Sequence, residues 1–273
     1  MVPLERNHPK TGSEGDELPR RRPAAVTDGY HRGMTEPDAV RLRTGLIEGI
    51  RASRAAEREV FDALDPAQRE APGPDGGWSA KDILAHLSAW RQREADRLSA
   101  RREGREDPAP PAAPPGPGID EINAGLHAER ADWAWDRVVA DADATADALI
   151  AEVSAASDDT LTDPKVIGSI LGDGAEHALG HLPQIAAGVS LQSRVLGLAD
   201  EHLAAIDRGG WPSRPAAVAR YNLACFHALA GNLDVARSLL RQALPGHDDL
   251  QTLAPTDDDL IAVRYELSVL RKG

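Results

Sequence analysis

The chain has 273 residues, of which 41% are hydrophobic, so it can bury a substantial core as one large or two ordinary domains. A formal net charge of −13 argues against nucleic acids and anionic membranes as partners, since both require clustered Lys and Arg. The single cysteine excludes an internal disulfide, and no apolar run approaches the roughly 20 residues of a membrane span, so a cytoplasmic protein is expected.

Helix-forming residues dominate the composition, and the sequence predicts an all-α protein. Alanine is abundant, aromatic residues make up only 4%, and runs of Val and Ile between turn residues are missing. Residues 1–34 combine scattered Pro and Gly with mixed charge and no periodicity, and we expect them to be a disordered extension. The first helical pattern begins at Met34, so translation could start at Met1 or at Met34.

Four long segments with helical spacing of apolar residues predict a four-helix bundle over residues 35–190. They cover residues 35–64, 79–104, 119–156 and 166–190. At the start of the second segment, Ser79 is followed three residues later by Asp82, which is a variant of the helix capping box. A proline-rich crossover at 107–118 precedes the third segment, and Pro183 is expected to kink the fourth.

The pattern changes after residue 190, and residues 191–273 are expected to form a small helical unit. Within it, residues 221–244 resemble a tetratricopeptide (TPR) repeat, two antiparallel helices joined around Gly231 and Asn232. The matching small and apolar positions are Leu223, Ala224, Gly231, Ala236, Leu240 and Ala243. Further helices are expected at 195–206 and at 256–270, the latter N-capped within the run Thr256-Asp-Asp-Asp-Leu260.

One clear repeat is fewer than the roughly three that usually make such an array stable by itself. The unit is therefore expected to pack against the bundle or against a second copy of the chain in a homodimer. Its TPR-like segment is a candidate docking site for a protein or peptide partner.

Two histidines four residues apart lie in the fourth bundle segment. Residues at i and i+4 share one helical face, so His177 and His181 can direct imidazole nitrogens to one point. That face is apolar or small and should be buried, through Ile167, Ile170, Gly174, Ile185 and Gly188. With His86 from the second segment, three neutral imidazoles would hold Zn²⁺ or Ni²⁺ and leave positions open for water or substrate.

Three stretches resemble the DinB-like four-helix-bundle superfamily. They are Gly77-Trp-Ser-Ala-Lys-Asp-Ile-Leu-Ala-His-Leu-Ser-Ala-Trp90, Asp120-Glu-Ile-Asn-Ala124 and Glu176-His-Ala-Leu-Gly-His-Leu-Pro-Gln-Ile185. Within the superfamily they are most similar to the ClbS/DfsB branch, named for self-protection against the genotoxin colibactin, which is related to mycothiol-dependent maleylpyruvate isomerases. The resemblance implies a divalent-metal site whose ligands fall here on His86, His177 and His181.

Two aspartates precede these histidines by one helical turn. Asp82 lies four residues before His86, and Asp173 lies four residues before His177. Each carboxylate could accept the second ring N–H of its histidine and fix the tautomer. Helix capping and exposure to solvent are the alternative roles.

Other polar and aromatic residues near the histidines are candidates for binding or proton transfer. Glu176 and Glu121 are candidate general bases, with a solvated helix face as the alternative. Asn123 could anchor a substrate, and Trp90 could form either core or pocket wall. His127, on the third segment, could approach the site or face water.

Four interpretations of the function remain open at this stage. The first is a metal-dependent hydrolase or thiol transferase that acts on a small electrophile in detoxification or self-protection. No cysteine lies within residues 35–190, so a thiol would come from a small-molecule cosubstrate. The alternatives are a mycothiol-dependent isomerase, a non-catalytic module that binds a small molecule or peptide, and a scaffold whose histidines are core residues.

Overall fold

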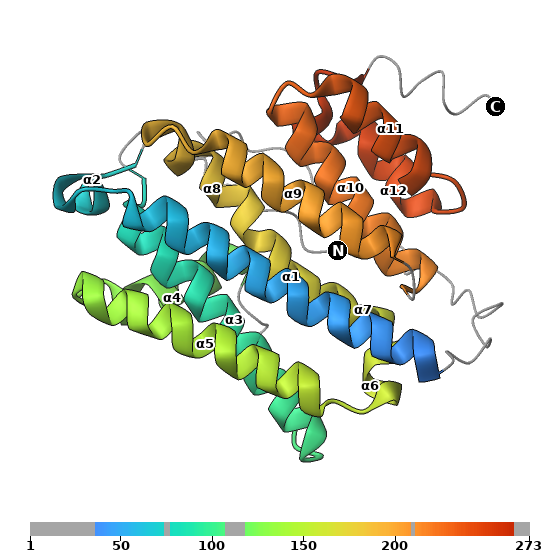
Figure 1. Cartoon of the computed structure of the whole chain (residues 1–273), viewed down its shortest axis with the longest axis horizontal. Coiled ribbons are helices and arrows are strands. Elements are labelled where there is room, and N and C mark those ends of the chain that lie inside the picture. The colour runs from blue at the N-terminus through green and yellow to red at the C-terminus, as the bar shows by residue number, and fades with distance from the viewer. Residues whose placement is uncertain (1–35, 74–76, 107–117, 209–210, 265–273) are drawn as a thin grey trace.

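The structure is a computed structural model that describes residues 36–73, 77–106, 118–208 and 211–264. The extension predicted for residues 1–34 lies outside the described residues. Over the described ranges the chain is helical and contains no strand, which confirms the all-α prediction (Figure 1). None of the helices in these ranges combines the length and the apolar composition that crossing a bilayer requires.

Four long helical rods form the bundle in Figure 1. They are α1 (Glu36–Asp62), α3 (Ala80–Arg102), α5 (Trp135–Ala155), and a fourth rod made of α7 (Pro164–Ser169), the π-helix η2 (Ile170–Glu176) and α8 (His177–Gly188). α3 and α1 both pack against α5 and against the fourth rod. Their inner faces share one core, which includes Leu46, Ile50, Leu87, Leu149, Ile167 and Leu182. Burial of these apolar faces is the main stabilising contribution to the bundle.

The predicted start of α3 is confirmed. The hydroxyl of Ser79 accepts a hydrogen bond from the backbone N–H of Asp82 at 3.2 Å, and the Asp82 carboxylate accepts one from the backbone N–H of Ser79 at 3.0 Å. This reciprocal pair satisfies two N–H groups that have no partner within the helix. The capping box therefore fixes where α3 begins and sets the position of His86 two turns later.

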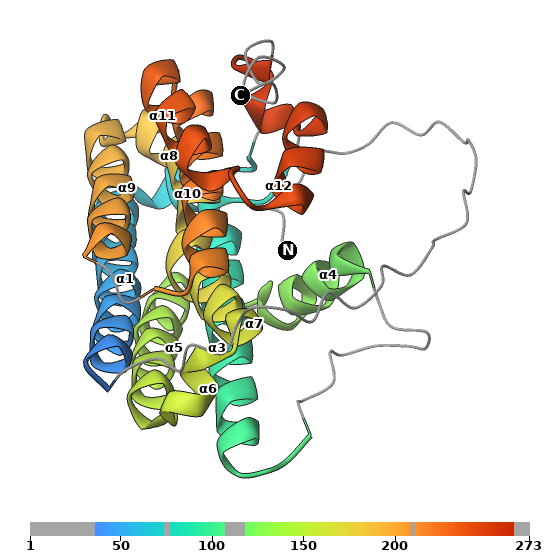
Figure 2. The same cartoon turned by 90° about the vertical axis from the view of Figure 1, so that its right-hand side faces the viewer.

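The single helix expected over residues 119–156 is wrong, because two helices occupy this range. α4 (Ile119–Arg130) ends before α5 begins, and residues 131–134 separate them. In the break, the Trp133 ring lies against two guanidinium groups, with Arg130 Cζ at 5.2 Å and Arg137 Cζ at 3.8 Å from its centroid. The break lets α4 leave the axis of α5 and pack beside α3 on the side away from α1 (Figure 2).

The fourth rod contains a π-helical segment that the apolar spacing does not indicate. At its end, the backbone N–H of His177 donates to the carbonyl of Gly172, five residues earlier. This wider turn changes the angular relation between α7 and α8, since a regular α-helix advances about 100° per residue. Ile167 and Ile170 are fully buried as expected, but Ile185 is half-buried and Gly188 is exposed. The predicted buried stripe therefore ends early.

Gly174, inside η2, allows the fourth rod to approach α1 and α5 closely. A Cβ at this position would lie 2.8 Å from Leu149 Cδ2 and 3.2 Å from Ile50 Cγ1. We expect Gly174→Ala to destabilise the fold by about 1–3 kcal/mol through overpacking. Gly172→Ala is the matched control in the same segment, because a Cβ there meets no atom within 4 Å. Urea unfolding measures both, and an equal effect of the two substitutions would contradict this packing.

The C-terminal unit packs directly on the bundle. α9 (Gln192–Asp207), which contains the helix expected at 195–206, lies against α1 and α8. α10 (Ser213–Leu229) and α11 (Leu233–Ala243) form a tight hairpin, and α10 contacts α9 and α7. The hairpin turns at Gly231, whose φ of 80° is a left-handed conformation that glycine adopts without strain.

The helix expected over residues 256–270 is wrong in its described part. After α12 (Asp248–Leu253), the chain forms two short 3₁₀ turns, Ala254–Thr256 and Asp258–Leu260. The predicted cap in the run from Thr256 to Leu260 is present as Asp257, whose carboxylate accepts the backbone N–H of Asp259 at 3.0 Å, but the turn that it caps is a short 3₁₀ turn. The Tyr221 hydroxyl also donates to Asp257 at 2.7 Å, and the extended backbone of Asp257 separates the two 3₁₀ turns. Residues 265–270 lie outside the described part of the chain.

His202, on α9, gives a testable dependence of stability on pH. Burial lowers the pKa of its imidazole from 6.5 to about 4, and the backbone of Gly49 opposes this shift. Between these values the unfolded chain binds a proton that the folded chain excludes, so stability falls as the pH drops through this window. From about pH 7 to pH 5, the wild type should lose about 2 kcal/mol more than His202→Leu. Urea unfolding of metal-free protein measures the difference, and equal losses would contradict it.

Candidate metal centre

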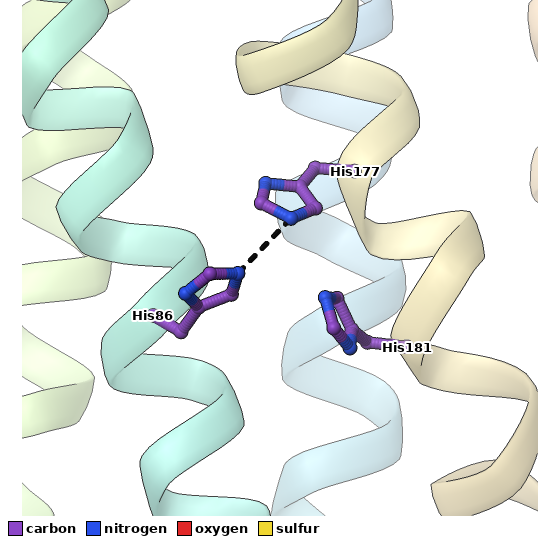
Figure 3. Close-up of side chains that lie close together, drawn as sticks. All are labelled: His86, His177 and His181. Atoms are coloured by element: carbon purple, nitrogen blue, oxygen red, sulfur yellow. Dashed lines mark hydrogen bonds between the residues drawn. The ribbon is translucent and has the colours of Figure 1, made fainter. Parts of the chain in front are cut away.

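Three imidazole rings converge between α3 and α8. His86 projects from α3, His177 and His181 project from α8, and Figure 3 shows the rings facing one another across the space between the two helices. One ring nitrogen of each histidine lies within 4.8 Å of the other two, and the Nε2 atoms of His86 and His177 are 3.1 Å apart. Zn–N bonds of about 2.0–2.1 Å in a tetrahedral site place ligand nitrogens about 3.3 Å apart. The spacing of the rings therefore fits a shared divalent cation.

The protonation state of the rings also fits a metal. Burial lowers the pKa of His86 well below 6.5, and the neighbouring His181 and His127 lower it further. Burial likewise lowers the pKa of His177, with added contributions from His86, His181 and Arg91. Both rings are therefore neutral at neutral pH, and the neutral ring is the form that coordinates a metal.

Two tryptophans enclose one side of the centre. The Trp78 ring lies 4.8 Å from the His86 ring, and the Trp90 ring lies 6.3 Å from His86 and 6.1 Å from His177, measured between centroids. Trp90 is buried, and its indole N–H donates to the side-chain oxygen of Asn123 on α4 at 3.1 Å. Trp90 is thus a core residue that also borders the rings, and Asn123 holds it in place.

Asp82 is engaged with residues other than His86. Its carboxylate accepts hydrogen bonds from the hydroxyl and the backbone of Ser79, and it pairs with the Nε2 of His127 at 3.3 Å. The Nδ1 atom of His86 has no hydrogen-bond partner among the described residues. The Asp82 carboxylate therefore caps α3 and pairs with His127, and it does not accept the Nδ1–H of His86. His127 reaches the edge of the site, where its ring stacks on Trp78 at 5.3 Å.

Asp173 lies in a separate charged cluster between η2 and α3. Burial and the charge of Glu94 raise the pKa of Asp173 to about 8, and Arg97 and Arg93 oppose the increase. The Nδ1 atom of His177 has no hydrogen-bond partner among the described residues. The structure shows no hydrogen bond between Asp173 and His177. Four residues complete a turn in an α-helix but less than a turn in the π-helical segment, so the two side chains are not aligned.

The two candidate general bases do not contact the rings in the described structure. Glu176 is buried, and its carboxylate accepts a hydrogen bond from Asn222 Nδ2 on α10 at 2.8 Å. Burial raises the pKa of Glu176 to about 7, while the bond from Asn222 lowers it. Glu121 is exposed, and it accepts the backbone N–H of Gly118 at 3.1 Å as a cap of α4.

A buried ion pair lies beside the centre, and the sequence analysis does not predict it. The side chains of Arg91 on α3 and Glu57 on α1 are 1% and 0% exposed, and both guanidinium nitrogens Nη1 and Nη2 contact the Glu57 carboxylate. Arg91 also places its Nε 3.4 Å from the carbonyl of Gly174 in η2. The sequence does contain one indication of this pair, because Glu57 lies on the apolar face of α1 that runs from Ile50 to Phe61, and a charge on a buried face requires a partner.

Comparison with known proteins agrees with the fold and the site. The family model described as the DinB superfamily matches residues 50–188, just over half of the chain. No curated protein and no solved structure matches the chain significantly. The matched region contains α3, η2 and α8 and therefore all three converging histidines. On this match over residues 50–188, the chain belongs to the DinB superfamily.

Proposed function

We propose that the protein is a divalent-metal-dependent enzyme that acts on a small electrophilic molecule, as a hydrolase or thiol transferase in detoxification or self-protection. The observation that carries the proposal is the convergence of His86, His177 and His181, two of them with pKa values lowered by burial. A metal role is also in keeping with the DinB superfamily, whose members often bind metal. We further propose the ClbS/DfsB branch as the closest part of the superfamily.

The three histidines would hold Zn²⁺ or Ni²⁺ and leave coordination positions free for water or a substrate. Such an ion supplies a Lewis acid that generates a nucleophile from water or from a thiol at neutral pH. His177 and His181 are half-buried residues, so in this proposal a substrate reaches the centre from their side, while buried Trp90 closes the side of α3 and α4.

A thiol used by this centre would be a cosubstrate. The only cysteine of the chain, Cys225, lies on α10 and is buried, and its sulfur is 3.8 Å from the carboxylate of Asp257. Neither residue belongs to the histidine cluster. A low-molecular-weight thiol is therefore part of the transferase form of the proposal.

A non-catalytic binding function is the second candidate, and one observation favours it. Glu176 and Glu121 contact Asn222 and Gly118 instead of the imidazole rings, so the described structure brings no carboxylate base to them. In this alternative the bundle sequesters a small molecule, and the α10–α11 hairpin serves as a TPR-like docking segment for a protein or peptide. The turn at Gly231, where the TPR-like repeat is expected to reverse direction, is the feature of the hairpin that agrees with this alternative.

Turnover by metal-loaded protein separates the two candidates. The full chain, loaded with Zn²⁺ or with Ni²⁺, is incubated with an activated ester and with 1-chloro-2,4-dinitrobenzene, each with and without N-acetylcysteine. After subtraction of the uncatalysed reaction without protein, we expect consumption beyond one equivalent by the wild type and no remaining consumption by His177→Ala. Consumption that stops at one equivalent would support sequestration and contradict catalysis on these electrophiles.

A further inference from the structure

Glu176, the residue before His177, is contacted by α10, which lies outside the four-helix bundle. The carboxylate of Glu176, which is 3% exposed, points to α10, where Asn222 Nδ2 donates to its Oε2 at 2.8 Å. A buried carboxylate is costly unless hydrogen bonds compensate for its lost hydration. This contact therefore ties the last residue of η2 to the C-terminal hairpin.

The π-helical turn is also contacted from the opposite side. Within the bundle core, Arg91 of α3 lies 3.4 Å from the carbonyl of Gly174, and the backbone of Gly174 packs against Leu149 and Ile50. π-helical turns are rare and less favourable than the α-helical alternative, so they persist where surrounding contacts hold them. In η2, these contacts come from α1, α3 and α5 on the side of the bundle and from α10 on the other side.

The register of this turn determines where His177 points. The bond from His177 N–H to the carbonyl of Gly172 defines the π register. If residues 170–176 returned to α-helical hydrogen bonding, the part of the rod beyond them would rotate by about 100°, the advance of one residue. His177 would then leave the position 3.1 Å from His86 that allows the two nitrogens to share a cation.

We propose that Asn222 is a positioning residue of the metal centre, which holds the π-helical register through Glu176 and makes the α10–α11 hairpin part of that centre. The inference rests on the proposed metal binding by the three histidines. It assigns the hairpin a role beyond docking: its attachment to Glu176 stabilises the arrangement of rings that binds the cation.

The coupling must act in both directions, because linkage between two equilibria is reciprocal. A cation that favours the ordered rings also favours the attachment of α10 to η2. Conversely, a change that detaches α10 weakens binding of the cation. Metal affinity and the protection of hairpin amides from hydrogen exchange therefore both depend on the contact between Asn222 and Glu176.

The test is Asn222→Leu in the full chain, with Zn²⁺ affinity measured by competition with a chromophoric chelator. We expect affinity about 10-fold weaker than in the wild type, at the lower end of the range for loss of a contact to a metal ligand, because Asn222 acts through Glu176 and does not contact a ligand itself. The visible absorption spectrum of bound Co²⁺ should also change, which a loss of stability alone would not cause. Asn232→Leu is the matched control, because Asn232 lies in the same hairpin and contacts His227 at 3.4 Å instead of the metal helix.

Hydrogen exchange of the wild type provides a measurement that needs no variant. Backbone amides of α10 should exchange more slowly after Zn²⁺ is added to chelator-treated protein. Wild-type affinity and an unchanged Co²⁺ spectrum in Asn222→Leu, together with unchanged exchange in α10, would overturn the role of Asn222 and leave the metal centre intact. A wild type that binds no Zn²⁺ would instead overturn the proposed function itself.

Discussion

Replacing Arg91 with methionine should lower the free energy of unfolding by about 3–5 kcal/mol, the cost of breaking a buried ion pair. The substitution leaves the Glu57 carboxylate, which is fully buried, without its main cation. Arg54 is the remaining cation near this carboxylate, with Nη1 3.5 Å from Glu57 Oε2. This second contact is long, so it should compensate for only part of the loss. Urea unfolding of chelator-treated protein measures the effect.

A double substitution separates the cost of an unpaired charge from loss of packing. Arg91→Met combined with Glu57→Leu removes both charges, and it should recover much of the stability that Arg91→Met loses. Arg58→Met is the control, since Arg58 pairs with Asp143 on the surface and its side chain is 56% exposed. A surface pair contributes less than about 1 kcal/mol. If Arg91→Met and Arg58→Met had similar effects, the buried pair would not have the importance assigned to it.

Replacing His177 with alanine should weaken Zn²⁺ binding by more than about 100-fold, because the loss of an outer contact alone costs about 10–100-fold. The His177 ring lies 4.7 Å from His86 and 5.1 Å from His181, and the His86 and His181 rings are 5.2 Å apart, so the three centroids form a nearly equilateral triangle. Competition with a chromophoric chelator measures the change. Some loss of stability of the metal-free protein should accompany the substitution, since burial of the ring lowers its pKa and its Nδ1 atom is buried, so Zn²⁺ affinity is compared under conditions where the variant is folded.

His202→Leu is the matched control for this experiment. His202 is also a buried helical histidine, but it lies on α9 and belongs to no cluster of ligands in the described part of the chain. Its replacement should leave Zn²⁺ affinity within about 2-fold of the wild type, since His202 supplies no nitrogen to the cluster of His86, His177 and His181. A similar loss of affinity in both variants would show that the histidines support the fold and do not coordinate the ion.

The sequence predicts those features of the site that depend on regular α-helix. His177 and His181 share a face because both lie within α8, where residues at i and i+4 are stacked. The start of α3 follows from Ser79 and Asp82 because a capping box is a local motif with its own hydrogen bonds. The buried faces of the two helices then bring His86 to the pair.

The features that sequence reasoning misses depend on departures from that regularity. Asp173 is four residues before His177, but the π-helix between them removes the assumed alignment. The direction of Glu176 depends on α10, which is distant in sequence and contributes Asn222. The break at residues 131–134 leaves the apolar spacing on either side intact, so periodicity alone does not reveal it.

Binding of one divalent ion by the three histidines is the claim on which the proposed function depends. Titration of chelator-treated full chain with Co²⁺, followed by visible absorption, tests it most directly. The wild type should bind one equivalent with the spectrum of a nitrogen-ligated site, and the variant with His86, His177 and His181 all replaced by alanine should bind none. Absence of binding by the wild type, or the same spectrum and stoichiometry in the triple variant, would contradict the metal centre.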